Sequence, residues 1–307
     1  MPDYLRERRL HAAIGLHGLG YAAKSWTALA DHLRDLGYTD SHIEAAGMAT
    51  HARNGHLIDR FLDRLTIPLQ DRDGYLVGFT ARSVPRAGDG DAPKYLNSPT
   101  TAIFRKSEVL YGLGEHAASV SGGRLPVVCE GPLDAIAVDL VAAQRGFPWA
   151  GLASIGTAFT EQHVRELRAV AGGRPICLAF DGDDAGRSAT EAAWRRLTDD
   201  GPYDVTVAEL PDRTDPASLL STEHDTLPQV LRSARPAATV IAARQIDAAR
   251  LDGHAAREVA AFSLAQSAHQ SDARRATNSI SARALQTASH PPTGRRIHGC
   301  GAETPPS

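Results

Sequence analysis

The spacing of hydrophobic positions divides the chain into a mixed first part and a regularly alternating second part. In the first part, residues 4–16 and 25–37 carry apolar side chains at helical spacing, and the second of these segments opens on a serine, a favoured N-cap. Residues 64–84 alternate apolar and polar side chains around the turn signal at residues 71–74, which is typical of a β-hairpin. Residues 86–93, rich in Gly, Asp and Pro, predict a loop.

In the second part, short apolar runs alternate with segments of helical spacing. The runs cover residues 125–130, 151–156, 175–181 and 204–210, and the helical segments cover residues 132–145, 160–172 and 185–197. This alternation predicts a parallel sheet with helices on both faces.

We therefore expect an α/β fold built from consecutive segments. Residues 1–115 form a mixed α+β subdomain, residues 116–215 a parallel-sheet subdomain, and residues 216–272 a short helical segment. Residues 273–307, rich in Ser, Thr, Arg, His and Pro, read as a disordered tail.

Composition narrows the function classes. With 42% hydrophobic and 22% charged residues, the chain is typical of a soluble globular protein. It has no apolar run near the roughly 20 residues of a membrane helix, and its start has no signal-peptide pattern, so we expect a cytoplasmic protein without a membrane partner. The three cysteines lie far apart without C-x-x-C spacing, so neither a disulfide framework nor a zinc site is expected.

The charge is unevenly distributed along the chain. Residues 111–235 carry 11 basic and 18 acidic side chains, whereas the segments on either side are weakly basic. An acidic middle between basic flanks suits a metal site beside a surface that binds a polyanion. A solvated acidic face would give the same pattern.

Carboxylates follow two of the predicted strands at the points where these strands end. One run reads Glu130-Gly131-Pro132-Leu133-Asp134, and the other reads Asp181-Gly182-Asp183-Asp184. Because the carboxyl ends of parallel strands share one edge of a sheet, these acids are expected to meet there. Clustered carboxylates repel one another unless a cation neutralises them, and Mg²⁺ prefers such oxygen ligands and supports phosphoryl or nucleotidyl transfer. For a single acid, Asp134 or Asp184, the alternative is a helix N-cap.

The same residues carry a resemblance to a known family. Glu130-Gly131-x-x-Asp134 followed by Asp181-Gly182-Asp183 resembles the TOPRIM signature of DnaG-type primases, topoisomerases and some nucleases. The segments YLRERRL, KYLNSP and AFDGDDAGRSA are similar, in the same order, to the catalytic core of DnaG-type bacterial primases. The likeness covers roughly residues 4–220. It implies an α/β primase core whose second subdomain is a TOPRIM sheet.

The resemblance implies DNA-templated synthesis of an RNA primer, with single-stranded DNA and NTPs as partners and Mg²⁺ or Mn²⁺ as cofactor. A 3′-OH would attack the α-phosphate of an NTP and release pyrophosphate. The residues matched to catalysis are Glu130, Asp181 and Asp183, and those matched to the metal are Glu130, Asp134, Asp181, Asp183 and Asp215. The residues matched to nucleotide or DNA binding are Arg82, Lys94, Tyr95, Asn97 and Lys106, with Arg60 and Arg64 as weaker candidates. At helical spacing, these last two could instead pair with Asp59 or Asp63.

The chain departs from a full primase in three ways. It shows no likeness to the family's N-terminal zinc-binding domain, so a separate zinc-bearing protein is a candidate partner. The family's D-P-D reads Asp215-Pro216-Ala217, which could weaken a second metal position. Residues 236–307 show no likeness to a helicase-binding domain, so a replicative helicase is a weaker candidate partner.

Other functions stay open at this point. A catalytically degenerate relative from a mobile element would bind single-stranded DNA without extending a primer. A TOPRIM nuclease would share the acids but would not require KYLNSP. A topoisomerase fits least, since it needs a separate domain with a nucleophilic tyrosine.

Overall fold

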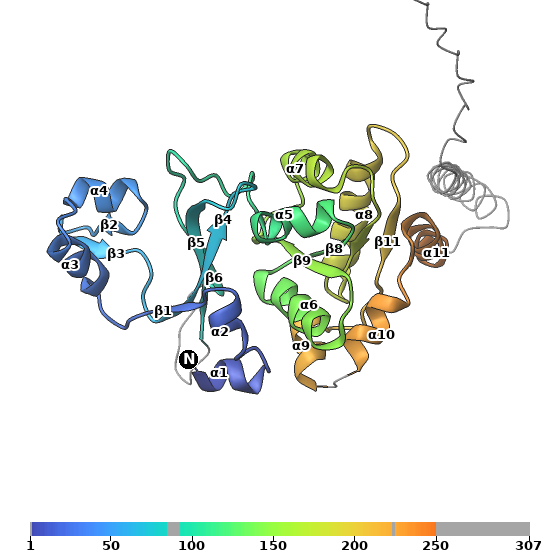
Figure 1. Cartoon of the computed structure of the whole chain (residues 1–307), viewed down its shortest axis with the longest axis horizontal. Coiled ribbons are helices and arrows are strands. Elements are labelled where there is room, and N and C mark those ends of the chain that lie inside the picture. The colour runs from blue at the N-terminus through green and yellow to red at the C-terminus, as the bar shows by residue number, and fades with distance from the viewer. Residues whose placement is uncertain (1, 85–92, 223–224, 250–307) are drawn as a thin grey trace, which may run out of the picture.

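A computed structural model describes residues 2–84, 93–222 and 225–249, which form an elongated arrangement of two larger sheets and one small one (Figure 1). The helices of the first part are α1 (Pro2–Glu7), α2 (Ala13–Leu16), α3 (Ala28–Asp35) and α4 (Asp40–Ala45). Its strands are β1 (Gly20–Ala22), β2 (Ala49–His51), β3 (Leu57–Asp59), β4 (Arg64–Gln70), β5 (Leu76–Ser83) and β6 (Tyr95–Asn97).

The first part contains an antiparallel sheet in the order β1-β4-β5-β6, and β2 pairs with β3 in a separate lobe with α3 and α4 (Figure 1). The predicted hairpin is confirmed as β4 and β5, whose turn is held by Asp71 Oδ1 accepting from the Asp73 and Tyr75 backbone N–H groups. The inward side chains of β4 are fully buried, as alternation requires.

Two helix predictions in this part were wrong in detail. The segment of residues 4–16 is not one helix, because the chain breaks after α1 and Arg9 adopts a left-handed conformation with φ +57°. Helix α3 begins at Ala28 rather than after Ser25. Its first amides donate to the buried Asp59 carboxylate, 30 residues downstream of Leu29. This tertiary cap is invisible to local sequence patterns.

The second part forms a six-stranded sheet in the order β12-β11-β10-β8-β9-β7. Its strands are β7 (Leu110–Tyr111), β8 (Leu125–Cys129), β9 (Trp149–Ser154), β10 (Ile176–Leu178), β11 (Val205–Val207) and β12 (Arg235–Pro236). Its helices are α5 (Leu113–Ser121), α6 (Pro132–Arg145), α7 (Glu161–Ala171), α8 (Asp184–Thr198), α9 (Pro216–Thr222), α10 (Thr226–Arg232) and α11 (Ala237–Ala249).

The four central strands are parallel, and only the edge strands β7 and β12 run antiparallel, which confirms the predicted sheet. Helix α6 has the predicted bounds, with Pro132 at its start and Gly146 at φ +70° after its end. Helix α8 is capped by Asp183, not by Asp184, and Asp134 lies inside α6, so the alternative in which Asp134 or Asp184 is a helix N-cap was wrong.

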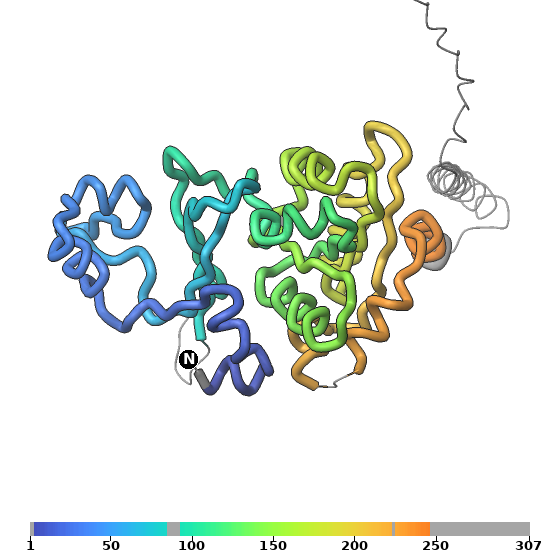
Figure 2. Tube along the Cα trace, viewed as in Figure 1, coloured from blue at the N-terminus to red at the C-terminus, as the bar shows by residue number. Residues whose placement is uncertain are grey.

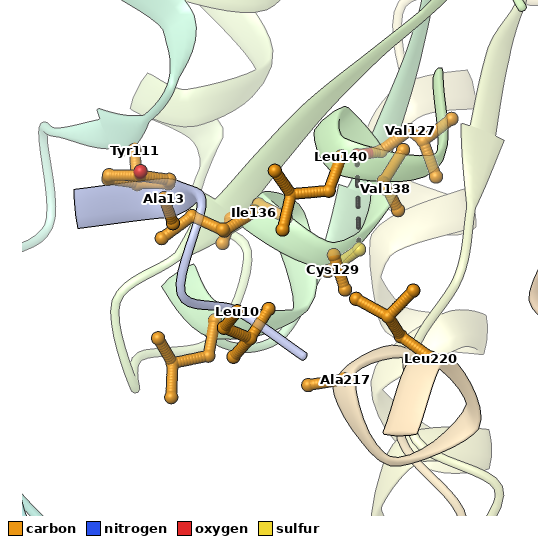
Figure 3. Packing of buried hydrophobic residues seen from close by; sticks show 14 of the residues in the cluster. Leu10, Ala13, Tyr111, Val127, Cys129, Ile136, Val138, Leu140, Ala217 and Leu220 are labelled. Carbon is orange, nitrogen blue, oxygen red and sulfur yellow. Dashed lines mark hydrogen bonds between the residues drawn. The ribbon is translucent and has the colours of Figure 1, made fainter. Parts of the chain in front are cut away.

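One hydrophobic core joins the two larger sheets (Figure 3). Leu10 and Ala13 of the N-terminal region lie close to Ile136 of α6, while Ala217 and Leu220 of α9 belong to the same buried cluster. Helix α6 is buried along most of its length, because it packs against α9 as well as against β9. The second sheet and the N-terminal helices are therefore held together by burial of apolar surface.

From left to right, Figure 2 shows the α3–α4 lobe, the antiparallel sheet, and then the second sheet and α11, and the chain begins at α1 below the antiparallel sheet. Strands β7 and β12 extend this sheet beyond residues 116–215, and the subdomain boundaries remain predictions. The predicted loop at residues 86–93 falls almost wholly, and the predicted tail at residues 273–307 wholly, outside the described residues. Within the described ranges, no helix combines the length and apolar character needed to span a membrane.

Candidate metal and nucleotide site

Glu130 and Asp181 lie together at the carboxyl ends of neighbouring strands. Strands β8 and β10 pair in parallel, with Val128 opposite Leu178, so both chains leave the sheet at the same edge. The backbone N–H of Asp181 donates to Glu130 Oε1 at 3.3 Å. The sequence-based expectation that these two acids meet is confirmed.

The two carboxylates share an environment that disfavours their charged forms. Burial, followed by the nearby Glu130, Asp215 and Asp183 charges, raises the pKa of Asp181 to about 7, and Lys94 opposes this shift. Burial also raises the pKa of Glu130. Asp181 Oδ1 is buried and has no hydrogen-bond partner among the described residues. A buried carboxylate oxygen without a partner is costly, and a cation would satisfy it.

Asp183 and Asp215 stand at the starts of two helices. Asp183 Oδ1 accepts from the Gly186 backbone N–H at 2.8 Å, and Asp215 Oδ1 accepts from the Ser218 backbone N–H at 2.6 Å. Each bond fixes one carboxylate oxygen at the positive end of a helix, α8 or α9. These side chains are therefore held in set directions near Asp181.

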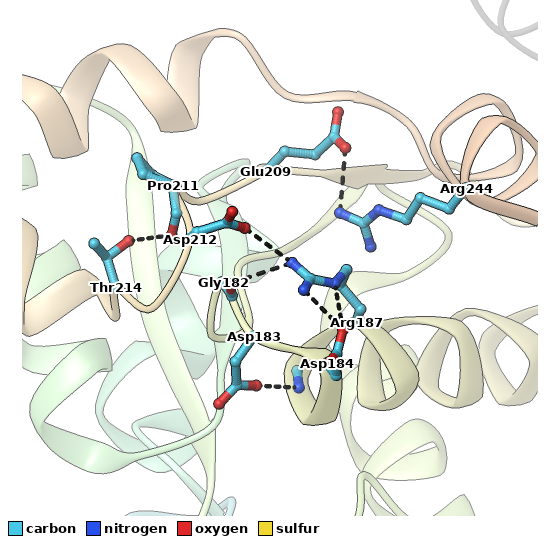
Figure 4. A network of polar contacts seen from close by, with 10 residues as sticks. Gly182, Asp183, Asp184, Arg187, Glu209, Pro211, Asp212, Thr214 and Arg244 are labelled. Carbon is cyan, nitrogen blue, oxygen red and sulfur yellow. Dashed lines mark hydrogen bonds and ion pairs between the residues drawn. The ribbon is translucent and has the colours of Figure 1, made fainter. Parts of the chain in front are cut away.

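Gly182 allows the Asp181 loop and the Asp215 loop to pack against each other. Its N–H donates to Thr214 O at 2.9 Å, and its carbonyl accepts from the Arg213 N–H at 3.0 Å. A Cβ at this position would lie 2.0 Å from Pro211 O, so only glycine fits. Figure 4 shows Gly182 facing the turn that carries Pro211 and Thr214.

Asp134 lies deeper than the other acids. Its side chain is 9% exposed, and Oδ1 accepts from the Ala217 backbone N–H at 3.2 Å. Burial, with added repulsion from Asp215 and Asp181, holds its pKa well above the ordinary range. The structure thus places Asp134 behind the surface carboxylates, where it ties α6 to α9.

The arrangement fits an open cation site better than a closed cage. Within residues 2–84, 93–222 and 225–249, no group of three or more His, Cys, Asp or Glu side chains has a geometry that could hold a metal ion by itself. Mg²⁺ commonly takes only one or two protein carboxylates and completes its shell with water and substrate phosphates. Glu130 and the unpartnered oxygen of Asp181 meet this requirement.

In the antiparallel sheet, Arg82 on β5 is buried, and Tyr95 on the edge strand β6 is half-buried. Arg82 is 7% exposed, and its Nη1 donates to the Tyr95 hydroxyl at 2.7 Å. The guanidinium lies 5.1 Å from the Tyr95 ring centre and 5.9 Å from that of Tyr4. Burial raises the pKa of Tyr95, and the Asp134 charge adds to this rise. The pair thus supports the acidic site from behind.

Three other predicted residues lie where the first part of the chain meets the second. Lys94 is exposed, and its positive charge opposes the rise in the pKa of both Glu130 and Asp181. Asn97 Nδ2 donates to Ile155 O at 3.4 Å, and Lys106 Nζ donates to Gly156 O at 2.8 Å. Asn97 and Lys106 therefore attach the first part of the chain to the loop that follows β9.

Arg60 and Arg64 do not lie on a helix, so the alternative of helix-face ion pairs was wrong. Arg60 donates through Nε and Nη2 to Asn97 O, at 3.3 and 3.0 Å. Arg64 Nη1 donates to Pro93 O at 2.8 Å, and burial lowers the pKa of this arginine. Both residues hold the segment that leads into and through β6.

Sequence reasoning missed two residues that touch this site. Tyr4 lies under the Arg82 guanidinium, and nothing in the local sequence connects residues so far apart. Arg187 contacts both acid-bearing loops. Its position one turn after Asp183 in a predicted helix was the signal that could have identified it.

Comparisons with known proteins give the family. A family model described as "DNA primase catalytic core, N-terminal domain" matches residues 1–117, and one described as "Toprim-like" matches residues 127–220. The chain is 39% identical over 220 residues to the DNA primase of Deinococcus radiodurans, which covers 71% of this chain and 37% of that protein. The chain spans about a third of the length of the curated relatives it matches.

Solved structures agree with these sequence matches. The RNA polymerase domain of Mycobacterium tuberculosis primase DnaG superposes with a TM-score of 0.73 at 30% identity, covering 90% of each chain. The same domain in complex with a double-stranded DNA oligomer that has a 6-nucleotide overhang gives a TM-score of 0.73 at 30% identity, covering 89% of this chain and 87% of that one. TOPRIM primases are generally metal-dependent. With both sheets, the strand-end acids and these matches in agreement, the chain belongs to the DnaG family of DNA primases.

Proposed function

We propose that this chain is a primase catalytic core that joins ribonucleotides on a single-stranded DNA template, with Mg²⁺ or Mn²⁺ held at Glu130 and Asp181. The observation that carries the proposal is the buried, unpartnered Asp181 Oδ1 beside Glu130 at the ends of parallel strands. It is supported by the family's relatives, whose names describe DNA primases and an RNA polymerase domain.

In the proposed reaction, a 3′-OH on the growing primer attacks the α-phosphate of an NTP. A new phosphodiester P–O bond forms, the bond to the β-phosphate oxygen breaks, pyrophosphate leaves, and the proton of the 3′-OH passes to water. The divalent cation, when bound, supplies positive charge at the phosphate oxygens. Glu130 and Asp181 hold the cation, with Asp183 and Asp215 as the neighbouring acids that complete the negative site.

Basic side chains close to the acids would position the polyanions. Lys94 is exposed, its charge acts on both carboxylates, and it would contact an NTP phosphate. Lys106, which is half-buried and donates to Gly156 O in the loop after β9, would contact the DNA backbone. The cytoplasm is the proposed setting. A replicative helicase and a separate zinc-bearing protein are the proposed partners.

Primer synthesis on single-stranded DNA tests the proposal. Labelled NTPs are supplied with Mg²⁺ or Mn²⁺, and products are compared for the unmodified chain, Asp181→Ala and Glu130→Gln. We expect short metal-dependent RNA products that both variants lose while keeping their circular dichroism spectra. Glu161→Ala, which removes an exposed carboxylate on α7, serves as the matched control and should retain activity.

Three results would contradict the proposal. DNA binding without any product would favour a degenerate binding relative. Metal-dependent cleavage of the template would favour a nuclease. Full synthesis by Asp181→Ala would remove the assigned site.

A further inference from the structure

We propose that Arg187 is a positioning residue that holds the two acid-bearing loops of the site at the separation a divalent cation requires. The loops are residues 181–183, which lie between β10 and α8, and residues 211–215, which precede α9. The inference rests on the proposed cation site, and it adds a residue that the family comparison and the sequence motifs did not assign.

A single guanidinium reaches both loops (Figure 4). Arg187 lies in the first turn of α8, and its Nη1 donates to Gly182 O at 3.2 Å and contacts Asp212 Oδ1 at 3.3 Å. Its Nη2 donates to Asp184 Oδ1 at 2.8 Å. Gly182 is the residue between two of the candidate acids, so this contact acts directly on the main chain that carries them.

In the described part of the chain, the other hydrogen bonds between these loops join main-chain atoms. They run from the Gly182 N–H to Thr214 O and from the Arg213 N–H to Gly182 O. Arg187 is therefore the side chain that adds a cross-link between the loops. A planar guanidinium can reach three acceptors at fixed angles, whereas a lysine ammonium is a single flexible point charge.

This cross-link opposes a repulsion present in the site itself. Asp215 lies on one loop and Asp181 on the other, and the Asp215 charge is among the causes that raise the pKa of Asp181. Without a cation, like charges push the loops apart. The Arg187 cross-link resists this movement and keeps the carboxylates in position to bind the cation. Residues that orient metal ligands have the same effect in metal sites generally.

The cross-link contributes little to global stability. Its acidic partners Asp184 and Asp212 are 100% and 89% exposed, and ion pairs exposed to this degree contribute little to folding. A variant without the guanidinium should therefore remain folded and lose mainly cation affinity. Weaker cation binding by a variant that remains folded distinguishes a positioning role from a general structural role.

Direct Mn²⁺ binding tests the inference. Electron paramagnetic resonance of free Mn²⁺ is measured during titration of the full chain, for the unmodified protein, Arg187→Ala and Arg187→Lys. We expect Arg187→Ala to weaken Mn²⁺ binding by about tenfold, the lower end for residues that orient metal ligands. Arg187→Lys should restore part of the affinity, and the melting temperatures should match.

Arg195→Ala is the matched control, because it removes an exposed arginine from the same helix whose ion pair with Glu191 is remote from the loops. It should bind Mn²⁺ like the unmodified chain. Equal Mn²⁺ affinity of Arg187→Ala and the unmodified chain would overturn the inference.

A second comparison covers the case in which Arg187→Ala unfolds. Asp212→Ala should weaken Mn²⁺ binding less than Arg187→Ala does. The Arg187→Lys/Asp212→Ala double variant should lose less Mn²⁺ affinity than the sum of the two single variants, because both substitutions disrupt the same Arg187–Asp212 contact. Strictly additive losses would overturn the inference.

The two proposals fail differently. An unmodified chain that binds no Mn²⁺ removes the cation site and the Arg187 role together. An unmodified chain whose Mn²⁺ affinity depends on Arg187 but that makes no primer contradicts only the proposed function.

Discussion

Asp134 Oδ1 accepts a hydrogen bond of 3.2 Å from the backbone N–H of Ala217, so the last residue of Asp215-Pro216-Ala217 holds a buried carboxylate through its main chain. The Ala217 methyl group itself is 1% exposed and lies in the apolar core (Figure 3). The position therefore has a structural role that does not need an acidic side chain.

Removing the Asp134 carboxylate is expected to destabilise the fold. Asp134→Ala leaves the buried Ala217 N–H without its acceptor, a loss of about 1–3 kcal/mol in the free energy of unfolding. Asp134→Asn keeps an acceptor oxygen and removes a buried charge, so it should retain more stability. Urea unfolding measures both variants against Glu161→Ala, which should match the unmodified chain. Equal stability of Asp134→Ala and Glu161→Ala would contradict a stabilising role for the hydrogen bond between the Ala217 N–H and Asp134.

Restoring an acid at residue 217 is expected to harm the protein rather than improve it. Ala217→Asp would place a carboxylate in the core beside Asp134, whose own pKa is already raised by burial and neighbouring acids. An unpaired buried charge costs several kcal/mol, so the melting temperature should fall sharply. Ala217→Asn, of similar size but neutral, is the control, and its melting temperature should fall less. A stable, more active Ala217→Asp would show that this position faces the cation.

The stability of the metal-free protein should fall as pH rises toward 7. Because the pKa of Asp181 is raised to about 7, the folded state keeps a proton that the unfolded state releases near the ordinary aspartate pKa of about 4. The stability contributed by the Asp181 proton is thus fully present below the ordinary aspartate pKa and is lost as pH rises toward the raised pKa of about 7. Melting temperatures in chelator, from pH 5 to pH 8, should decline less for Asp181→Asn. If the melting temperatures of the unmodified chain and Asp181→Asn change with pH in the same way, the raised pKa of Asp181 is contradicted.

Arg82 and Lys106 should respond differently to substitution. Arg82→Ala removes a buried hydrogen bond and ring contacts, so it should lower the unfolding free energy by about 2–4 kcal/mol. Lys106→Ala should leave stability near that of the unmodified chain. It should instead reduce the salt dependence of single-stranded DNA binding by roughly one phosphate contact, about 0.7 in the log–log slope. Thermal melting and binding at several salt concentrations separate the two roles, and the reverse pattern would contradict them.

The alternation of apolar runs and helical segments was enough to predict the parallel sheet and α6, because both follow from local periodicity and strong boundary residues. The glycine after Glu130 likewise marked the end of β8, whereas β10 ends at Leu178, before Asp181, and the carboxyl-end rule placed both acids at one edge. These features depend on residues that are close in sequence. The amino-acid sequence alone therefore indicates the type of site.

Contacts between distant segments were decided only by the tertiary structure. Three such contacts join segments that share no local pattern. Asp59 caps α3, and Arg82 is buried between Tyr4 and Tyr95. The backbone N–H of Ala217 donates to the buried Asp134 carboxylate. Sequence spacing identified which acids could meet at the sheet edge. Packing decided which of them stay accessible at that edge and which lie buried behind it, because burial and hydrogen-bond partners depend on neighbours that the chain brings together only on folding.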